Sequence, residues 1–111
     1  MTIKTIKQII SRANQKLETV EWQLRYNNKY RAYKLVKHIQ LRTRQNEPYW
    51  WPTIIIPEMV VSSFTKAFVV FCESNKRDTL SKAYFTHEDA LAIKKDSKKV
   101  QAVLNTQLSL F

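Results

Sequence analysis

The sequence predicts an α+β fold in one domain, and three observations lead to this prediction. The first 45 residues carry apolar side chains at steps of three and four, the period of an amphipathic helix. Three prolines then fall within ten residues, at 48, 52 and 57, and they exclude a long helix there. The segment that follows is rich in β-branched and aromatic residues, which favour strands. A chain of 111 residues also has the length of a single domain.

The expected domain covers residues 1–104 and has three parts. Basic helices occupy 1–45, a proline-rich connector occupies 46–57, and a β-β-α unit occupies 58–104. A short tail, 105–111, follows the domain.

Two helices are predicted in the first part. The first has one apolar stripe, made of Ile3, Ile6, Ile10, Ala13, Leu17, Val20 and Leu24. Asn27-Asn28 marks a break, because Asn favours caps and turns over helix interiors. The second helix, 29–44, places four apolar residues on one face: Ala32, Leu35, Val36 and Ile39. The two helices would pack as an antiparallel hairpin, and one continuous helix is the alternative.

The second half of the chain is predicted to hold a β-hairpin and a final helix. In the connector, a short extended piece is expected at 54–56, and Pro57-Glu58 suits the first turn of a short helix. The segments "KAFVVFCE" and "TLSKAYF" are predicted as two strands joined by a turn at "NKRD". The sequence "THED" is similar to a capping box and would open a helix over 87–104.

Composition excludes several classes of protein. The chain has no glycine, so neither a glycine-rich phosphate loop nor a dinucleotide-binding fingerprint is present. Cys72 is the single cysteine, which rules out an internal disulfide and fits a reducing compartment. No apolar run approaches the ~20 residues that a membrane span needs, and the first residues lack the apolar core of a signal peptide. A cytoplasmic protein with no membrane partner is therefore expected.

Catalysis is not predicted. His38 and His87 have no Cys or His partner at the spacing of metal ligands, so they are interpreted as surface or capping residues. Glu73 and Lys76 lie close together, as in some nuclease sites, but no second acid stands at a suitable spacing for a metal ion. Cys72 is interpreted as a small core residue. No cofactor, metal or small-molecule ligand is expected.

The positive charge is concentrated in the first 45 residues and predicts a polyanionic partner, with nucleic acid first. Only two acids, Glu18 and Glu21, accompany eleven basic residues there. The candidate nucleic-acid-binding residues are Lys4, Lys7, Arg12, Lys16, Arg25, Lys29, Arg31, Lys34, Lys37, Arg42 and Arg44. They would contact phosphates without regard to base sequence, and a merely solvated helix surface is the alternative.

Aromatic residues accompany this charge. Tyr26, Tyr30 and Tyr33 are interleaved with the basic residues, and Tyr49 to Pro52 forms the cluster "YWWP". Both groups could stack on nucleic-acid bases. The favoured interpretation is that the tyrosines seal the helix pair and that the YWWP cluster covers the core, because aromatic side chains bury the largest apolar areas.

The chain ends on the apolar pentapeptide "QLSLF". This peptide resembles the clamp-binding motif of bacterial replication and repair proteins, whose pattern is Gln-Leu-Ser/Asp-Leu-Phe, and it matches at all five positions. The resemblance covers five residues of 111 and does not extend to the rest of the fold. It implies that Gln107 hydrogen-bonds at the entrance of a pocket on the DNA polymerase sliding clamp. Leu108 and Ser109 would follow a groove, while Leu110 and Phe111 would fill the deep apolar part.

Together these features predict a non-enzymatic protein associated with DNA replication or repair. It would bind the sliding clamp with Gln107–Phe111 and DNA with its basic helices. A small phage- or plasmid-borne factor that recruits or inhibits the host clamp fits this size, and the sequence does not separate recruitment from inhibition. The alternative is a small DNA-binding regulator whose apolar tail packs on its own domain. A small enzyme acting on DNA is the least favoured class.

Overall fold

A computed structural model describes residues 2–84, 88, 91 and 92 of the chain. It confirms the mixed α+β class. The elements, in chain order, are α1 (Thr2–Lys16), β1 (Val20–Asn27), β2 (Ala32–Arg42), β3 (Pro48–Val60), α2 (Val61–Ser74) and α3 (Thr79–Tyr84).

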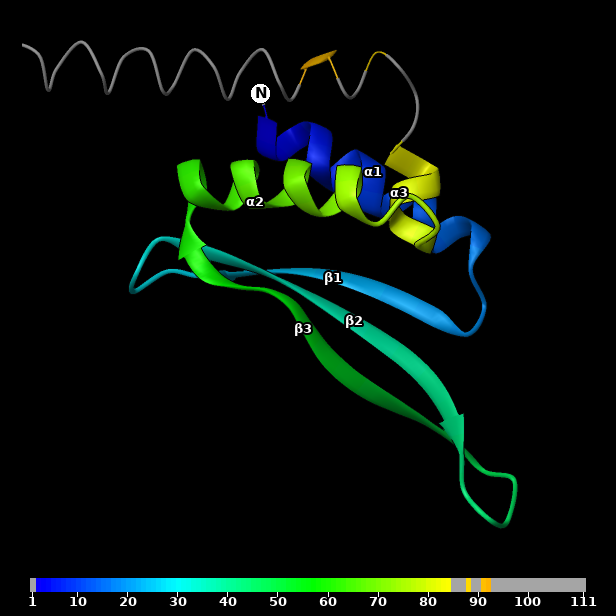
Figure 1. Ribbon diagram of the computed structural model, residues 1–111. Helices are drawn as coiled ribbons and strands as arrows, with labels where there is room; N and C mark the ends of the chain where they lie inside the picture. The colour runs from blue at the N-terminus through cyan, green and yellow to red at the C-terminus, as the bar shows by residue number, and fades with distance from the viewer. Residues whose placement is uncertain (1, 85–87, 89–90, 93–111) are drawn as a thin grey trace, which may run out of the picture.

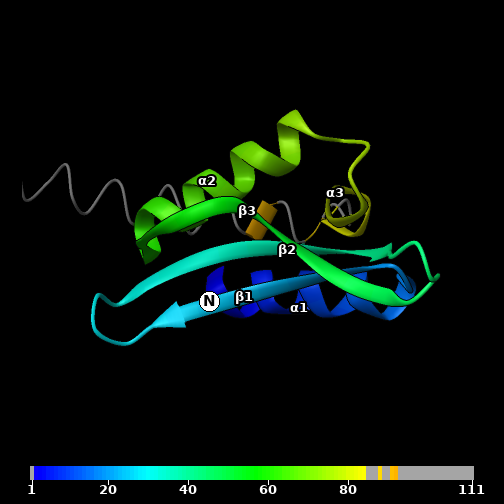
Figure 2. The ribbon, with the colours of Figure 1, turned by 90° about the horizontal axis from the view of Figure 1, so that it is seen from below.

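The described residues form two layers, an antiparallel sheet and a layer of helices. The strands have the order β1-β2-β3, so that β2 is central and β3 is an edge strand. Figure 1 shows α1, α2 and α3 on one side of the sheet. Seen from below in Figure 2, the strands lie in front of α1 and no described helix crosses in front of them. We call the side without helices the outer face.

The core lies between the helices and the sheet, and α1 supplies one side of it. Ile6, Ile10 and Ala13 are buried on this helix, as the predicted stripe requires, and Ile9, which the stripe left out, is buried as well. The helix ends at Lys16, well before the end of the predicted stripe. Leu17 is partly buried against the same core, so the stripe predicts burial correctly beyond the helix itself.

The predicted helical hairpin is wrong, because residues 20–27 and 32–42 are paired strands. Val20 and Leu24 are four residues apart, a spacing that suits a helix but also places two residues on the same face of a strand. Trp22, between them, is only 1% exposed, so the true pattern alternates with a period of two. The Asn27-Asn28 break is confirmed as the end of β1. There the Asn27 carboxamide oxygen accepts a hydrogen bond from the Lys29 backbone N–H at 3.0 Å.

The predicted connector, 46–57, is mostly strand β3. Its prolines exclude a long helix, as expected, but an edge strand tolerates residues that lack an N–H donor. Pro48 is the first residue of β3, and Pro57 lies where the register between β2 and β3 shifts. The short helix expected at Pro57-Glu58 is not formed, since α2 begins at Val61.

The predicted β-hairpin is also wrong, because its two segments form α2 and α3. Phe64, Phe68 and Cys72 recur every four residues and are fully buried, so packing on the sheet overrides the strand preference of these residue types. The turn between the two segments is confirmed at 75–78. The helix predicted over 87–104 lies outside the described residues apart from 88, 91 and 92.

Polar contacts join the layers around Trp22. Its indole Nε1–H donates to the Thr79 hydroxyl at 3.0 Å, and the Asn14 side chain bonds its backbone N–H and carbonyl at 2.8 and 2.9 Å. Trp22 therefore connects β1 to both α1 and α3. None of the described helices has the length and apolar character needed to cross a bilayer.

Candidate nucleic-acid interface

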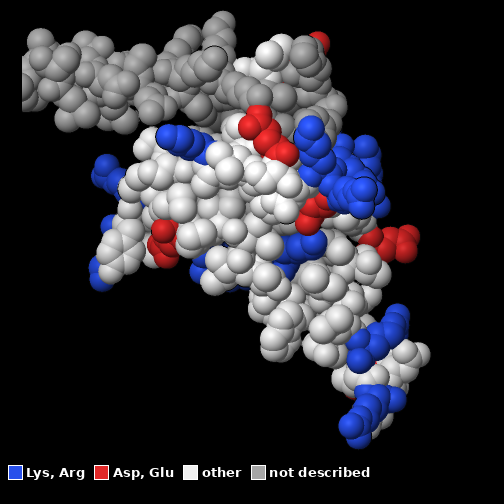
Figure 3. All heavy atoms as spheres, in the orientation of Figure 1, with Lys and Arg blue, Asp and Glu red and all other residues white. Residues whose placement is uncertain are grey.

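The predicted basic residues are spread over several elements rather than along two helices. Lys4, Lys7, Arg12 and Lys16 lie on α1, Arg25 on β1, Lys29 and Arg31 in the following turn, Lys34, Lys37 and Arg42 on β2, and Arg44 in the loop after it. In Figure 3, one basic group lies at the lower right, at the end of the β2–β3 hairpin, and a larger one lies beside α3. Among the residues that the structure describes, the basic side chains therefore form separate regions and not one basic helix face.

Near α3, basic residues from distant parts of the sequence come together. Lys16 and Lys82 line one shallow pocket between α1 and α3. The Arg12 guanidinium donates to the Ala83 carbonyl at 3.3 Å, which ties α1 to α3. The sequence prediction missed Lys82 because it placed that residue on a strand far from α1.

Lys37 differs from the other candidates because it is turned toward the core. Its ammonium group lies 3.1 Å from the Asp78 carboxylate and 5.1 Å from the centre of the Trp22 ring. The side chains of Lys37 and Asp78 are 19% and 20% exposed. This lysine links β2 to the start of α3, and we leave it out of the interface.

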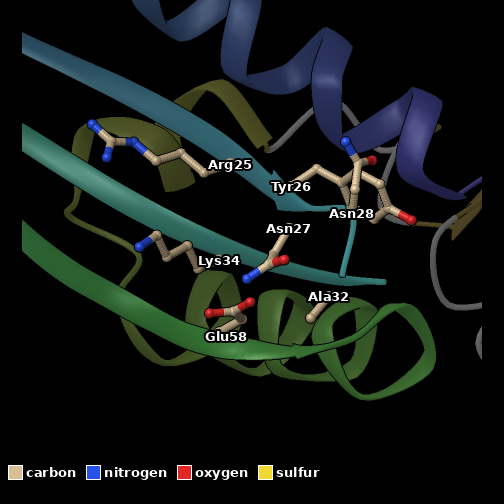
Figure 4. Close-up of a pocket in the computed structure, with 7 residues that line it drawn as sticks. All are labelled: Arg25, Tyr26, Asn27, Asn28, Ala32, Lys34 and Glu58. Carbon is tan, nitrogen blue, oxygen red and sulfur yellow. The ribbon is translucent and has the colours of Figure 1, made fainter. Parts of the chain in front are cut away.

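The outer face carries basic residues from neighbouring strands. Arg25 on β1 pairs in register with Lys34 on β2, so both side chains lie on the same face. They line an open pocket of about 350 Å³ that also contains Glu58 from β3 (Figure 4). Arg25 donates two hydrogen bonds to the Gln23 side-chain oxygen, at 3.2 and 3.0 Å, which hold its guanidinium along the strand.

Beyond the helices, β2 and β3 continue as a two-stranded ribbon. We call residues 38–54 the arm; it extends to the lower right in Figure 1. Every residue from 41 to 54 is exposed. Strand pairing continues to Arg42 opposite Pro48, at the end of the ribbon.

The end of the arm is closed by its own hydrogen bonds. The Thr43 N–H donates to the Glu47 carbonyl at 2.9 Å, and the Asn46 N–H donates to the Thr43 carbonyl at 2.9 Å. The Glu47 N–H donates to the Thr43 hydroxyl, and the Arg42 guanidinium donates to the Asn46 carbonyl. Asn46 has φ of 64°, a left-handed conformation that Asn tolerates. The loop is therefore held in one geometry.

The arm also carries the YWWP cluster, and the prediction that this cluster covers the core is wrong. Tyr49, Trp50 and Trp51 are 41%, 43% and 58% exposed. The three earlier tyrosines cannot seal a helix pair, because this part of the chain forms strands; Tyr33 packs against the core, and its ring lies 4.7 Å from that of Tyr26 at a tilt of 39°. Tyr30 is 61% exposed in the β1–β2 turn, away from the core.

The described residues offer little for catalysis. They contain no group of three His, Cys, Asp or Glu side chains that could hold a metal ion. Burial raises the pKa of the Cys72 thiol to about 12, so it stays protonated at neutral pH and is a poor nucleophile. His38 lies at the base of the arm, and its buried Nδ1 has no hydrogen-bond partner among the described residues.

The clamp-binding resemblance lies outside the described residues, since Gln107–Phe111 falls beyond them. No protein-family model, curated protein or solved structure matches the chain. The function must therefore be inferred from the residues of this chain.

Proposed function

We propose that this chain is a non-enzymatic protein associated with DNA replication or repair in bacteria. It binds the sliding clamp through Gln107–Phe111 and contacts DNA through exposed basic residues. Its place is the cytoplasm, where the clamp and DNA are found, and its small size fits a phage- or plasmid-borne factor that recruits or inhibits the host clamp. The single observation that carries the proposal is the match of the last five residues to the clamp-binding pattern.

The position of the buried core supports this proposal. Among the described residues, the core cluster runs from Ile6 to Ala83 and already combines all three helices with all three strands. This core is complete within residues 6–83, so we expect the domain to fold without the last five residues. We expect Leu110 and Phe111 to fill a pocket on another protein.

The energetics of a short apolar peptide indicate a weak contact. Burying Leu110 and Phe111 would supply roughly 1.5–3 kcal/mol for each side chain, and part of this is lost in ordering the peptide. We expect a dissociation constant on the order of micromolar for the peptide alone. A second contact is needed for tight binding.

Exposed charge supports DNA as that second contact. Eight of the eleven candidate basic residues are exposed, namely Lys4, Lys7, Lys16, Arg25, Lys29, Arg31, Arg42 and Arg44. A protein that neutralises phosphates with such residues binds DNA of any sequence, with an affinity that falls steeply as salt rises. The clamp encircles DNA, so one protein can contact both.

The test is a titration of purified clamp with the full chain and with tail variants. Leu110→Ala/Phe111→Ala should abolish binding, whereas Ser109→Asp should preserve it because the clamp-binding pattern accepts either residue at that position. The melting temperature of the double variant should equal that of the parent protein. If the double variant instead melts at a much lower temperature, the tail packs in its own domain and the protein is the DNA-binding regulator of the alternative interpretation.

A further inference from the structure

The arm exposes large apolar side chains on both of its faces. Tyr49 and Trp51 lie opposite Leu41 and Ile39, so these four share one face of the ribbon. Trp50 lies opposite Gln40 on the other face, between the pairs His38–Pro52 and Arg42–Pro48. Exposed aromatic clusters of this kind indicate a surface that meets a ligand.

The aromatic residues are held before any ligand binds. The arm is paired along both strands and closed at its end by the four hydrogen bonds described above. Little conformational entropy would therefore be lost when a ligand contacts Trp50 or Trp51.

Positive charge follows the same outer face as Trp50. Lys34 and Arg42 lie an even number of residues apart on β2, so their side chains share the outer face with Arg25. Eight residues of strand separate them by about 26 Å. Arg44 adds a cation at the end of the arm, while Glu21, Glu47 and Glu58 reduce the net charge. The face thus offers cations at both ends of a track and an indole ring near one end.

We propose that the outer face of the arm and the adjoining sheet bind single-stranded DNA, with Trp50 stacking on a base and Arg25, Lys34, Arg42 and Arg44 contacting phosphates. This inference rests on the DNA contact of the proposed function and names the kind of DNA. An aromatic ring can stack only on a base whose face is open, and the bases of a duplex already cover one another. Single strands present open base faces of every sequence, so stacking on them needs no base-specific contact.

The outer face carries few cations, so phosphate contacts alone would bind DNA weakly and base stacking must supply part of the affinity. With about four phosphates neutralised, the slope of log affinity against log salt should be near −3 for a single strand. A purely electrostatic site on this chain would show no preference for single strands. A second copy of the chain is a less suitable occupant, because two arms packed together would bring Arg42 and Arg44 close to like charges.

The test uses a fluorescent thymidine oligonucleotide of about twelve nucleotides and the matching duplex, with the full chain at low salt. Trp50→Ala should weaken single-strand binding about tenfold or more, equal to about 1.4 kcal/mol, whereas Trp51→Ala, on the opposite face of the ribbon, should change it little. Trp50→Phe should retain most of the affinity, because a phenyl ring still stacks. Tyr30→Ala is the matched control, since this aromatic side chain is 61% exposed but lies in the β1–β2 turn; it should have no effect.

The melting temperature of every variant is measured together with its affinity, so that a loss of folding is not mistaken for a loss of binding. If single strands bind but Trp50→Ala changes nothing, the outer face of the arm is not the site, although the proposed DNA contact stands. If the parent protein binds neither oligonucleotide nor duplex, the DNA contact itself is wrong, and clamp binding remains to be judged by its own titration. If sedimentation shows a dimer that Trp50→Ala dissociates while DNA affinity is unchanged, the outer face of the arm is a self-association surface.

Discussion

The β2–β3 hairpin has two halves of similar composition and opposite surroundings. In the half under the helices, Leu35 and Ile56 are 0% and 3% exposed, whereas in the arm Leu41 and Tyr49, on the same face of the sheet, are 39% and 41% exposed. Large apolar residues of one face, on the same two strands, thus belong to the core in one half and to the surface in the other. What differs is the helix layer, which covers only the first half (Figure 1).

The two halves of the hairpin are therefore expected to serve different purposes: the half under the helices stabilises the fold, and the arm binds a ligand. Apolar residues under the helices leave water when the chain folds, and each contributes to the free energy of unfolding. Apolar residues of the arm remain in water in the folded protein, so their removal should change binding far more than folding. Each prediction below tests that separation.

The largest effect on stability is expected from the buried half. Phe68 is 0% exposed on α2, and Phe68→Ala should lower the free energy of unfolding by about 3–5 kcal/mol, because it removes apolar contacts and leaves a cavity. Trp51→Ala, a larger truncation on the arm, should cost about 1 kcal/mol or less, the value of a cross-strand pair. Urea denaturation measures both. Equal losses would show that the arm is packed against something in the folded protein.

A smaller loss is expected at the contact between β2 and α3. The Asp78 carboxylate accepts hydrogen bonds from the Lys37 ammonium at 3.1 Å and from the Leu80 N–H at 3.2 Å. Asp78→Ala removes this ion pair and the cap of α3, and should cost about 1–2 kcal/mol. Glu47→Ala, which removes an acid from the exposed end of the arm, should leave the unfolding midpoint unchanged.

The free energy of unfolding is expected to vary with pH above neutrality because of Cys72. Its folded pKa is raised from 9.0 to about 12 by burial, so the folded state keeps a proton that the unfolded chain releases above pH 9. Cys72 contributes its full share to the free energy of unfolding below pH 9. This contribution declines as the pH rises toward 12, and at pH 10 it is smaller by about 1.4 kcal/mol. The gap in stability between the parent protein and Cys72→Ala should therefore narrow between pH 8 and pH 10. A gap that stays constant would contradict the raised pKa.

The smallest effect concerns the turns at the two ends of the sheet. Arg31 has φ of 48° in the β1–β2 turn, a left-handed conformation that favours glycine. Arg31→Gly should stabilise the protein by about 0.5–1 kcal/mol. Asn46→Gly at the end of the arm should change stability by only a few tenths of a kcal/mol, because Asn already tolerates this conformation. Thermal unfolding of the two variants compares the two turns directly.

The sequence predicted burial better than it predicted secondary structure. Ile6, Ala13 and Leu35 were placed in the core and are buried, because apolar side chains leave water in whichever element they occupy. Local composition misassigned "KAFVVFCE" as a strand, since its β-branched and aromatic residues prefer strands only where a sheet offers them neighbours. Its buried residues in fact follow a helical period, and that signal was available in the sequence.

The candidate interface was predicted less well than the core. The basic residues were identified, but their arrangement depends on which strands pair, and this is a property of the folded chain. Lys37 carries the same charge as Lys34, but the strand register places the two side chains on opposite faces of the sheet. Lys37 contacts Asp78 on the helix side, and Lys34 lies beside Arg25 on the outer face. The exposure of Trp50 and Trp51 follows from the length of the arm beyond the helices, which residue types alone do not specify.

The central claim is that one protein contacts the clamp and DNA together. Gln107 follows Tyr84 by 23 residues, so the clamp pocket can lie at most about 80 Å from the end of α3. Within that reach the basic residues can meet DNA that passes through the ring, and the second contact is then intramolecular, which raises its effective concentration.

The direct measurement is the affinity for clamp loaded on DNA compared with the affinity for clamp alone. At low salt, loaded clamp should bind at least about tenfold more tightly, or roughly 1.4 kcal/mol. Raising the salt should remove this advantage and leave the apolar contact of Leu110 and Phe111 in place. Equal affinity for free and loaded clamp at low salt would contradict the account, because the protein would then occupy the clamp pocket without contacting DNA.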